Sequence, residues 1–198
     1  MPKLLSPDQI DDFRDQLIDA AERLFAERGQ EGVSLRQLAA EVGISAMTPY
    51  RYFADKAAIL SAVRARAFDR FADALETAFA GPGGVAERAQ AVGLAYVRFA
   101  FERPAAYRLM FDLRQPDEAL YPDLVRALAR ARATLTAHVQ AAVDEELIAG
   151  DVELVGHAYW ATLHGLIGLK LADKLAEVDF EAAMDTAMCA LGRGFARR

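Results

Sequence analysis

The chain of 198 residues is poor in cysteine and histidine and lacks any long hydrophobic run. With Cys189 as the sole cysteine, no disulfide can form within the chain, which agrees with a reducing cytoplasm. Helical spacing predicts that Cys189 is buried by packing rather than exposed as a redox switch. No window approaches about 18 consecutive apolar residues, and the acidic N-terminal stretch has no hydrophobic run. We therefore expect a cytoplasmic protein with neither a membrane span nor a secretory signal.

The three histidines do not form a pattern typical of a metal site or of catalysis. His157 and His164 share a helical face, but His138 belongs to another predicted helix. The chain has neither a Glu-x-x-His pair nor a Cys-x-x-Cys motif. Nucleophile arrangements, phosphate-binding glycine loops and nucleotide-binding fingerprints are also missing. We expect no metal, no cofactor and no enzymatic activity.

Helical periodicity runs through the whole sequence. Hydrophobic residues make up 54% of the chain, which is ample for a core, and no alternation of period two persists anywhere. The predicted fold class is therefore all-α. The expected long helices cover residues 8–28, 55–80, 85–103, 121–149, 152–175 and 180–196, with a short helix after Pro104 and a loop over 112–122.

Residues 34–53 show the clearest local pattern, which is two short helices joined by a glycine turn. Ser34 can cap the first helix, Gly43 can adopt the positive φ that ends it, and Ser45 can cap the second. The first helix has one apolar face, formed by Leu35, Leu38, Ala39 and Val42. This is the helix-turn-helix arrangement, whose second helix can enter the major groove of DNA.

The second of these helices would expose side chains that suit DNA. Small, hydroxylic and aromatic groups near a helix N-terminus can reach base edges, thymine methyl groups and phosphates. Its outward face carries Ala46, Met47, Thr48, Tyr50 and Arg51. On spacing alone, a plain helical hairpin packed in a core fits about as well, although such a hairpin would rarely expose both Tyr50 and Tyr52.

Residues 15–60 closely resemble the DNA-binding domain of the TetR family of bacterial transcriptional regulators. The matching residues are Ile18-x-x-Ala21-x-x-Leu24-Phe25-x-x-x-Gly29, Ser34-Leu35-Arg36-x-Leu38-Ala39, Val42-Gly43-Ile44-Ser45 and Thr48-Pro49-Tyr50-Arg51-Tyr52-Phe53-x-x-Lys56-x-x-Ile59-Leu60. Two positions depart from the family pattern, which often has Gly at Met47 and Leu or Ile at Pro49. Because proline lacks a backbone donor and disfavours α geometry at Thr48, we expect a tightly wound or irregular start of the second helix.

The resemblance implies a role for each matching residue. Arg36 would reach a guanine edge and Ser34 a phosphate. The side chains that would face bases are Ala46, Met47, Thr48 and Tyr50, and those that would hold the DNA backbone are Arg51, Tyr52 and Lys56. The full set predicted to bind DNA is Ser34, Arg36, Ser45, Ala46, Met47, Thr48, Pro49, Tyr50, Arg51, Tyr52 and Lys56.

The charge balance is acidic, with a net charge of −6 at neutral pH. Residues 1–60 hold 7 basic and 10 acidic side chains, whereas residues 34–56 carry a net +1. Non-specific affinity for DNA follows local phosphate contacts rather than net charge. We therefore expect weak non-specific binding and reliance on a specific, paired operator.

Residues 85–196 resemble one C-terminal class of the same family, which has a Trp-His-Gly signature. The residues that carry this likeness are Arg103-Pro104-Ala105-Ala106-Tyr107-Arg108-Leu109-Met110-Phe111 and Trp160-Ala161-Thr162-Leu163-His164-Gly165. The resemblance implies a DNA-binding domain at 1–60 and an effector-binding and dimerisation domain at 61–198. Apolar cavities between helices are the usual small-molecule sites. The candidate lining residues, for which core packing is an equal alternative, are Tyr96, Phe99, Tyr107, Met110, Phe111, Trp160 and His164.

Dimerisation is expected from the geometry of DNA reading. One recognition element reads only a few base pairs, so specificity requires two of them about 34–36 Å apart on a palindromic operator. The last two long helices are rich in Ala, Gly and Leu and can pack closely against a partner chain. The candidate interface residues, which packing within one chain would also explain, are Leu163, Leu166, Ile167, Leu171 and Met188.

These inferences favour a homodimeric, sequence-specific repressor that a small hydrophobic or aromatic effector releases from double-stranded DNA. Two other functions remain open at this point. One is an effector-independent DNA-binding protein that recruits a protein partner. The other is a helical carrier of a lipid or another hydrophobic molecule that does not bind DNA, although an intact reading helix argues against it.

Overall fold

The fold is all-helical, as the sequence predicts. The structure is a computed structural model that describes residues 7–111, 117–175 and 177–197, and within these ranges it contains helices and turns but no strand. No described helix combines the length and the hydrophobicity that crossing a bilayer requires. Of the loop predicted at 112–122, residues 112–116 lie outside the described residues, as do the first six residues of the chain, and residues 118–120 form a short 3₁₀ helix.

The chain divides into two compact units. Residues 1–68 and 105–128 form unit 1, and residues 69–104 and 129–198 form unit 2. Helices α3 (Lys56–Phe79) and α6 (Pro122–Asp144) each contribute one part to unit 1 and another to unit 2. The domain boundary expected at residue 60 stays a prediction.

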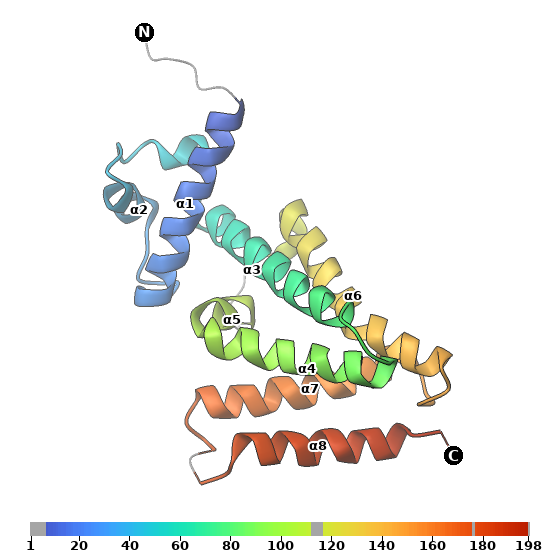
Figure 1. The fold of residues 1–198 in the computed structure, drawn as a ribbon. Coiled ribbons are helices and arrows are strands. Elements are labelled where there is room, and N and C mark those ends of the chain that lie inside the picture. Colours follow the sequence, from blue (N-terminus) through green and yellow to red (C-terminus); the bar gives the residue numbers. More distant parts are fainter. Residues whose placement is uncertain (1–6, 112–116, 176, 198) are drawn as a thin grey trace. The chain divides into compact units, whose positions relative to one another are not determined.

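Unit 1 is built on the N-terminal helices. It contains α1 (Pro7–Arg28), α2 (Leu35–Val42), the short 3₁₀ helix η1 (Pro49–Arg51) and the first turns of α3 (Figure 1). To these it adds α5 (Pro104–Phe111), the 3₁₀ helix η2 (Glu118–Leu120) and the start of α6. Apolar side chains from several of these elements form one core, which includes Leu17, Leu24, Leu38, Phe53, Ile59 and Leu109.

Two arginines of α3 lie inside unit 1 and are paired with acids. The Arg66 guanidinium contacts Asp19 at 2.7 Å and Glu22 at 2.9 Å, which joins α3 to α1. Arg64 is only 2% exposed, and its Nη2 donates to the Glu118 carboxylate at 2.6 Å and to the Met110 carbonyl at 3.2 Å. A buried guanidinium requires such partners, because burial of an unpaired charge is costly.

Unit 2 is a bundle that contains α4 (Val85–Glu102), α7 (Val152–Leu171) and α8 (Phe180–Phe195) with the remaining parts of α3 and α6. Helices α7 and α8 run antiparallel side by side, and α4 packs on α7 (Figure 1). The Phe71 ring of α3 meets the rings of Tyr96 and Phe99 edge-on at 5.1 and 5.3 Å. Gly156 allows close packing of α7 on α6, since a Cβ there would lie 3.0 Å from the Leu135 carbonyl oxygen.

Two helices end earlier than the sequence pattern predicts. Helix α6 stops at Asp144 rather than near 149, because Glu146 adopts a φ of 59° and the next residues turn away. Those residues join the C-terminal segment, where the Ala149 N–H donates to the Phe195 carbonyl at 2.8 Å. Helix α7 stops at Leu171 rather than 175, because Asp173 has a φ of 53° and provides the left-handed residue that glycine usually supplies.

Candidate nucleic-acid interface and ligand cavity

Helix α2 begins and ends as its sequence predicts. Ser34 Oγ accepts from the Gln37 N–H at 3.3 Å, and Gln37 Oε1 accepts from the Ser34 N–H at 2.8 Å, which completes a capping box. Gly43 ends the helix with a φ of 73°, and the Ile44 N–H then donates to the Ala39 carbonyl at 2.9 Å. These contacts fix the direction in which the chain leaves α2.

The second helix of the motif is irregular, as Pro49 predicts: residues 45–52 form a turn followed by the three-residue 3₁₀ helix η1 instead of a regular α-helix. The Thr48 N–H donates to the Ser45 carbonyl at 2.8 Å, and the Tyr52 N–H donates to the Pro49 carbonyl at 3.0 Å. Both bonds span three residues, which is the 3₁₀ pattern. Pro49 explains the change, since it has no N–H with which to continue an α-helical ladder from Ser45.

The turn and η1 present several of the predicted DNA-binding residues to solvent. Met47 is 69% exposed and Tyr50 is 45% exposed. Thr48 is half-buried, and the Pro49 ring is buried, so Pro49 contributes its backbone geometry rather than a surface side chain. The exposed members of the predicted set, called the motif surface below, are Ser34, Arg36, Ser45, Ala46, Met47, Tyr50 and Arg51.

Tyr52, Lys56 and Ser34 of the predicted set make contacts within unit 1. The Tyr52 ring is half-buried and lies 5.0 Å from the Phe13 ring of α1. Lys56 Nζ donates to the Gln30 carbonyl at 3.0 Å. The Ser34 hydroxyl bonds to Gln37 Oε1 at 2.9 Å in addition to its capping bond. Tyr52 and Lys56 therefore also position η1 and α3 against the rest of the unit.

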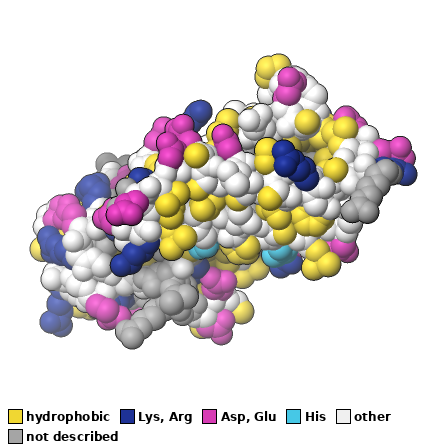
Figure 2. Space-filling model, turned by 90° about the horizontal axis from the view of Figure 1, so that it is seen from below, with side chains coloured by type: hydrophobic (Ala, Val, Ile, Leu, Met, Phe, Trp, Pro, Cys, Tyr) yellow, Lys and Arg dark blue, Asp and Glu magenta, His cyan; other side chains and the backbone are white. Residues whose placement is uncertain are grey.

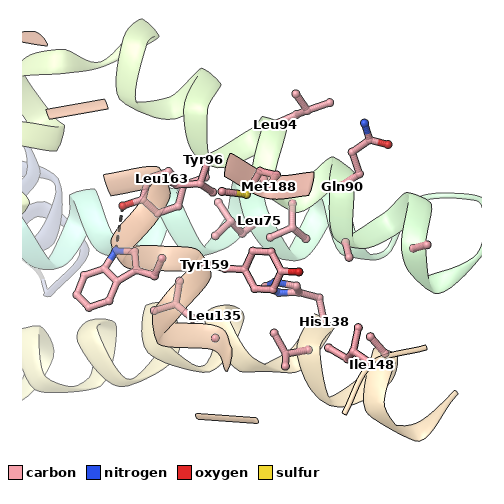
Figure 3. Close-up of a pocket in the computed structure, with 18 of the residues that line it drawn as sticks. Leu75, Gln90, Leu94, Tyr96, Leu135, His138, Ile148, Tyr159, Leu163 and Met188 are labelled. Atoms are coloured by element: carbon pink, nitrogen blue, oxygen red, sulfur yellow. Dashed lines mark hydrogen bonds between the residues drawn. The ribbon is translucent and has the colours of Figure 1, made fainter. Parts of the chain in front are cut away.

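Unit 2 contains a cavity of about 760 Å³ that apolar side chains line for the most part (Figure 3). Its walls come from the second part of α3 and from α4, α6, α7 and α8. Of the residues predicted to bind a ligand, Tyr96 and Trp160 line it. The Trp160 Nε1–H donates to the Tyr96 hydroxyl oxygen at 3.0 Å, which is the dashed contact in Figure 3.

The structure does not bring the other predicted ligand residues to this cavity. Phe99 packs on Phe71 in the core, and His164 lies outside the lining, with its Nδ1 3.3 Å from the Tyr96 hydroxyl. The remaining three belong to unit 1. There Tyr107 and Met110 are buried and Phe111 is half-buried, with its ring 5.0 Å from that of Tyr107.

Several lining residues were not identified from the sequence. Tyr159 and His138 supply polar atoms, and α8 supplies Met184 and Cys189. Cys189 is exposed, which corrects the expectation that it is buried, since no residue of α8 is buried within the chain. A sequence signal for Tyr159 did exist, because Gly156, Tyr159 and Leu163 recur at helical spacing on one face of α7.

Burial changes the protonation of the ionisable groups near the cavity. It lowers the pKa of His138 and of His164 below the ordinary histidine value, and it raises the pKa of the Tyr159 phenol. Each shift favours the uncharged form. His138 Nδ1 lies 3.1 Å from the Thr134 carbonyl oxygen, which can only accept, so Nδ1 carries the proton and Nε2 has the free lone pair.

The predicted dimer interface requires a correction at two residues, because Leu163 and Ile167 are buried within the protomer. Leu166, Leu171 and Met188 are half-exposed, and Met188 also lines the cavity. Seen from the side of α8, the surface over α7 and α8 consists mostly of hydrophobic and uncharged groups (Figure 2). Exposed residues at helical spacing form this surface, called the α7–α8 face below: Ala161, Gly165, Leu169, Ala182, Thr186, Ala190 and Gly194.

Together these features define an all-helical protein with an N-terminal helix-turn-helix motif and a separate helical unit that encloses an apolar cavity. Family models agree with both parts. The model "Bacterial regulatory proteins, tetR family" matches residues 17–63, and "Tetracyclin repressor-like, C-terminal domain" matches residues 89–191. The chain belongs to the TetR family and is a DNA-binding transcriptional regulator.

Solved structures share the fold over the whole chain. A protein of unknown function from Rhodococcus sp. RHA1 is 28% identical, with a TM-score of 0.83 and coverage of 100% of both chains. A TetR family transcription regulator from Marinobacter aquaeolei VT8 is 23% identical, with a TM-score of 0.72 and coverage of 98% of this chain and 100% of its own. The fatty acid degradation regulator FadR from Bacillus halodurans is 19% identical, with a TM-score of 0.73 and coverage of 96% of both. No curated protein is significantly similar to the chain.

Proposed function

We propose that the chain is a homodimeric repressor that binds a palindromic operator through the motif surface and is released by a small hydrophobic effector in the cavity of unit 2. The observation that carries this proposal is the exposure of Met47, Tyr50 and Arg51 on a turn whose Pro49 and Phe53 are buried. An apolar, a phenolic and a cationic side chain exposed together on a turn that buried residues anchor can contact base edges, thymine methyl groups and phosphates.

The motif surface contains groups for both kinds of DNA contact. Arg36 and Tyr50 carry donors that suit base edges, and the Met47 side chain suits a thymine methyl group. Arg51 suits a phosphate, as does Lys56, although the Lys56 ammonium also bonds to the Gln30 carbonyl and lies 3.8 Å from the Glu31 carboxylate. A phosphate contact by Ser34 would compete with Gln37 for the hydroxyl proton.

The α7–α8 face supports a dimer. Its exposed residues are small or apolar, and two such faces can approach closely to form a four-helix interface. A dimer is also what operator recognition requires, since two motifs are needed on successive major grooves. We therefore place the interface on the exposed residues of α7 and α8 rather than on Leu163 and Ile167.

The cavity supports an effector. A volume of about 760 Å³ falls in the range of small-molecule sites, and its apolar walls with a few polar groups are typical of them. The name of the Bacillus halodurans relative associates that protein with fatty acid degradation. An apolar effector would act by binding more tightly to the conformation that does not hold the operator.

Selection of genomic DNA fragments by the purified protein tests the proposal. We expect the recovered fragments to share a palindromic sequence. Tyr50→Ala and Arg51→Ala should each reduce affinity for that sequence at least tenfold, whereas Arg103→Ala, which removes an exposed charge from unit 2, should leave it unchanged. Recovery of unrelated fragments, or full operator affinity in Tyr50→Ala, would refute the assigned surface.

A further inference from the structure

The charged side chain among the described lining residues of the cavity is acidic rather than basic. Among the described residues that line it, none is Lys or Arg, and Asp185 of α8 supplies a carboxylate. Asp185 is exposed on α8. An anionic ligand would leave water without gaining a cationic partner, and that transfer is strongly unfavourable.

Some hydrogen-bonding groups of the cavity already have partners within the chain, whereas others have a donor or an acceptor that a ligand can use. The Tyr96 hydroxyl accepts from the Trp160 N–H and also lies 3.3 Å from His164 Nδ1, so both of these groups already have partners. His138 directs its protonated Nδ1 to the Thr134 carbonyl, which leaves the Nε2 lone pair as an acceptor. The Tyr159 hydroxyl forms no hydrogen bond with any described residue, and Figure 3 shows this side chain among the lining residues.

We propose that the cavity binds an uncharged apolar molecule that carries a hydroxyl or a similar hydrogen-bond donor, and that it excludes carboxylates. The donor of the ligand binds His138 Nε2, the Tyr159 hydroxyl adds a second polar contact, and the hydrocarbon part fills the apolar space. This inference rests on the proposed function of the cavity as the effector site. It separates the chain from a regulator that binds a free fatty acid anion.

Trp160 makes the proposal measurable, because it is the sole tryptophan and it lines the cavity. Its fluorescence can be titrated with three probes of equal chain length, which are 1-decanol, decyl methyl ether and decanoate at pH 8. We expect 1-decanol to bind about tenfold more tightly than the ether, because the ether lacks the donor of one hydrogen bond. Decanoate should bind more weakly than both.

Variants of the two polar residues test the assignment. In His138→Leu, the preference for 1-decanol over the ether should disappear while affinity for the ether is retained, which also shows that the cavity is intact. Tyr159→Phe removes only a hydroxyl and should lower the preference in part. Decanoate binding as tight as that of 1-decanol, an unchanged preference in His138→Leu, or no fluorescence response to any probe would overturn the proposal.

Operator affinity in the presence of 1-decanol is a separate readout. The fluorescence titration alone decides the class of ligand, because it requires no DNA. If 1-decanol binds with the expected preference and the operator affinity stays the same, the proposed release by effector fails and the ligand class stands. If decanoate releases the operator and 1-decanol does not bind, the effector role stands and the ligand class fails.

Discussion

Met47 illustrates how one residue of the motif surface can carry specificity. It is 69% exposed at a position where the family often has glycine, and its thioether chain offers no hydrogen bond of ordinary strength. An apolar side chain distinguishes bases in the major groove by contact with the C5-methyl group of thymine. We therefore expect at least one thymine in each half of the operator to be read through its methyl group.

Replacement of thymine by uracil tests this expectation, since it removes one methyl group and keeps every base-pairing atom. At the position that Met47 reads, the substitution should weaken binding severalfold, by about 1 kcal/mol. Met47→Ala should bind the thymine and uracil operators equally. Equal binding of both operators by the unmodified chain would show that Met47 contacts no methyl group.

His138 predicts how stability depends on pH. Burial lowers its pKa below the ordinary value of 6.5, so the folded chain keeps it neutral at a pH where the unfolded chain binds a proton. The free energy of unfolding should therefore decrease as the pH falls through about 6.5, and this contribution should level off below the folded pKa. Urea denaturation at pH 7.5, 6.5 and 5.5 measures the effect.

The matched variant for this measurement is His138→Leu, which lacks the titrating group. Its free energy of unfolding should decrease less between pH 7.5 and 5.5 than that of the unmodified chain. His164 has the same direction of pKa shift and is present in both proteins, so it cancels in the comparison. Parallel pH profiles would mean that His138 titrates normally in the folded chain.

At the scale of the elements, helix positions and caps follow from local sequence, whereas exact ends and the site depend on tertiary contacts. Ser34 and Gly43 are recognisable because their roles are set by neighbours within a few residues. The ends of α6 and α7 are not, because Glu146 and Asp173 take positive φ without being glycine. The replacement of the second motif helix by η1 follows from Pro49, which the sequence marked as a point of irregularity.

Most residues that line the cavity could not be predicted from the sequence. The sequence pattern does not distinguish aromatic residues that line a cavity from those that pack in the core. Tyr96 lines the cavity, whereas Phe99, one turn further on, packs in the core. Which face of a helix meets a cavity depends on neighbours that come from four other segments of the chain. The polar contribution of Tyr159 and His138 was missed for the same reason.

We expect replacement of glycine by alanine to have opposite effects on stability at two positions in unit 2. At Gly156, a new Cβ would lie 3.0 Å from the backbone oxygen of Leu135, so Gly156→Ala should push α7 from α6 and cost about 1 to 3 kcal/mol. At Gly93, the nearest atom is 3.9 Å away, so Gly93→Ala should raise helix propensity and stabilise the chain by up to about 1 kcal/mol. Thermal denaturation of both variants measures these effects.

Both changes add one methyl group inside a helix of unit 2, so a difference in stability between the two variants reports the packing around each glycine. Destabilisation by Gly156→Ala together with stabilisation by Gly93→Ala would support the close packing of α6 and α7. Equal stabilisation by both would show that the two helices lie further apart than described.

At the scale of the whole molecule, the dimer interface that we propose on the α7–α8 face leads to a prediction about the state of assembly. Ala190→Glu places a carboxylate on this face, and in a symmetric dimer it would meet its own copy or apolar groups of the partner. We expect sedimentation to show a monomer for Ala190→Glu and a dimer for the unmodified chain. Operator affinity should also fall in Ala190→Glu, because a monomer binds DNA through one motif instead of two linked motifs.

The control for this prediction is Leu120→Glu, which adds the same charge at a residue that is 69% exposed on η2 of unit 1. It should remain dimeric. Circular dichroism of both variants shows whether each is folded. A folded Ala190→Glu that is still dimeric would place the interface elsewhere.

The proposed release by an effector also predicts coupling between the cavity and the motif. If a cavity ligand lowers operator affinity by some factor, the operator must lower affinity for that ligand by the same factor. We expect Trp160 titrations with 1-decanol to show weaker binding when saturating operator DNA is present. Equal ligand affinities with and without DNA would mean that the two sites are independent.

The anchoring of η1 by Pro49 and Phe53 has a consequence for evolution. The anchors keep the turn in place, while the neighbouring Ala46, Met47 and Tyr50 face solvent and add little to folding. Mutations at these exposed positions are therefore nearly neutral for stability, and a duplicated gene can acquire a new target sequence through them in small steps. Divergence of regulatory circuits can proceed here without any loss of a stable product.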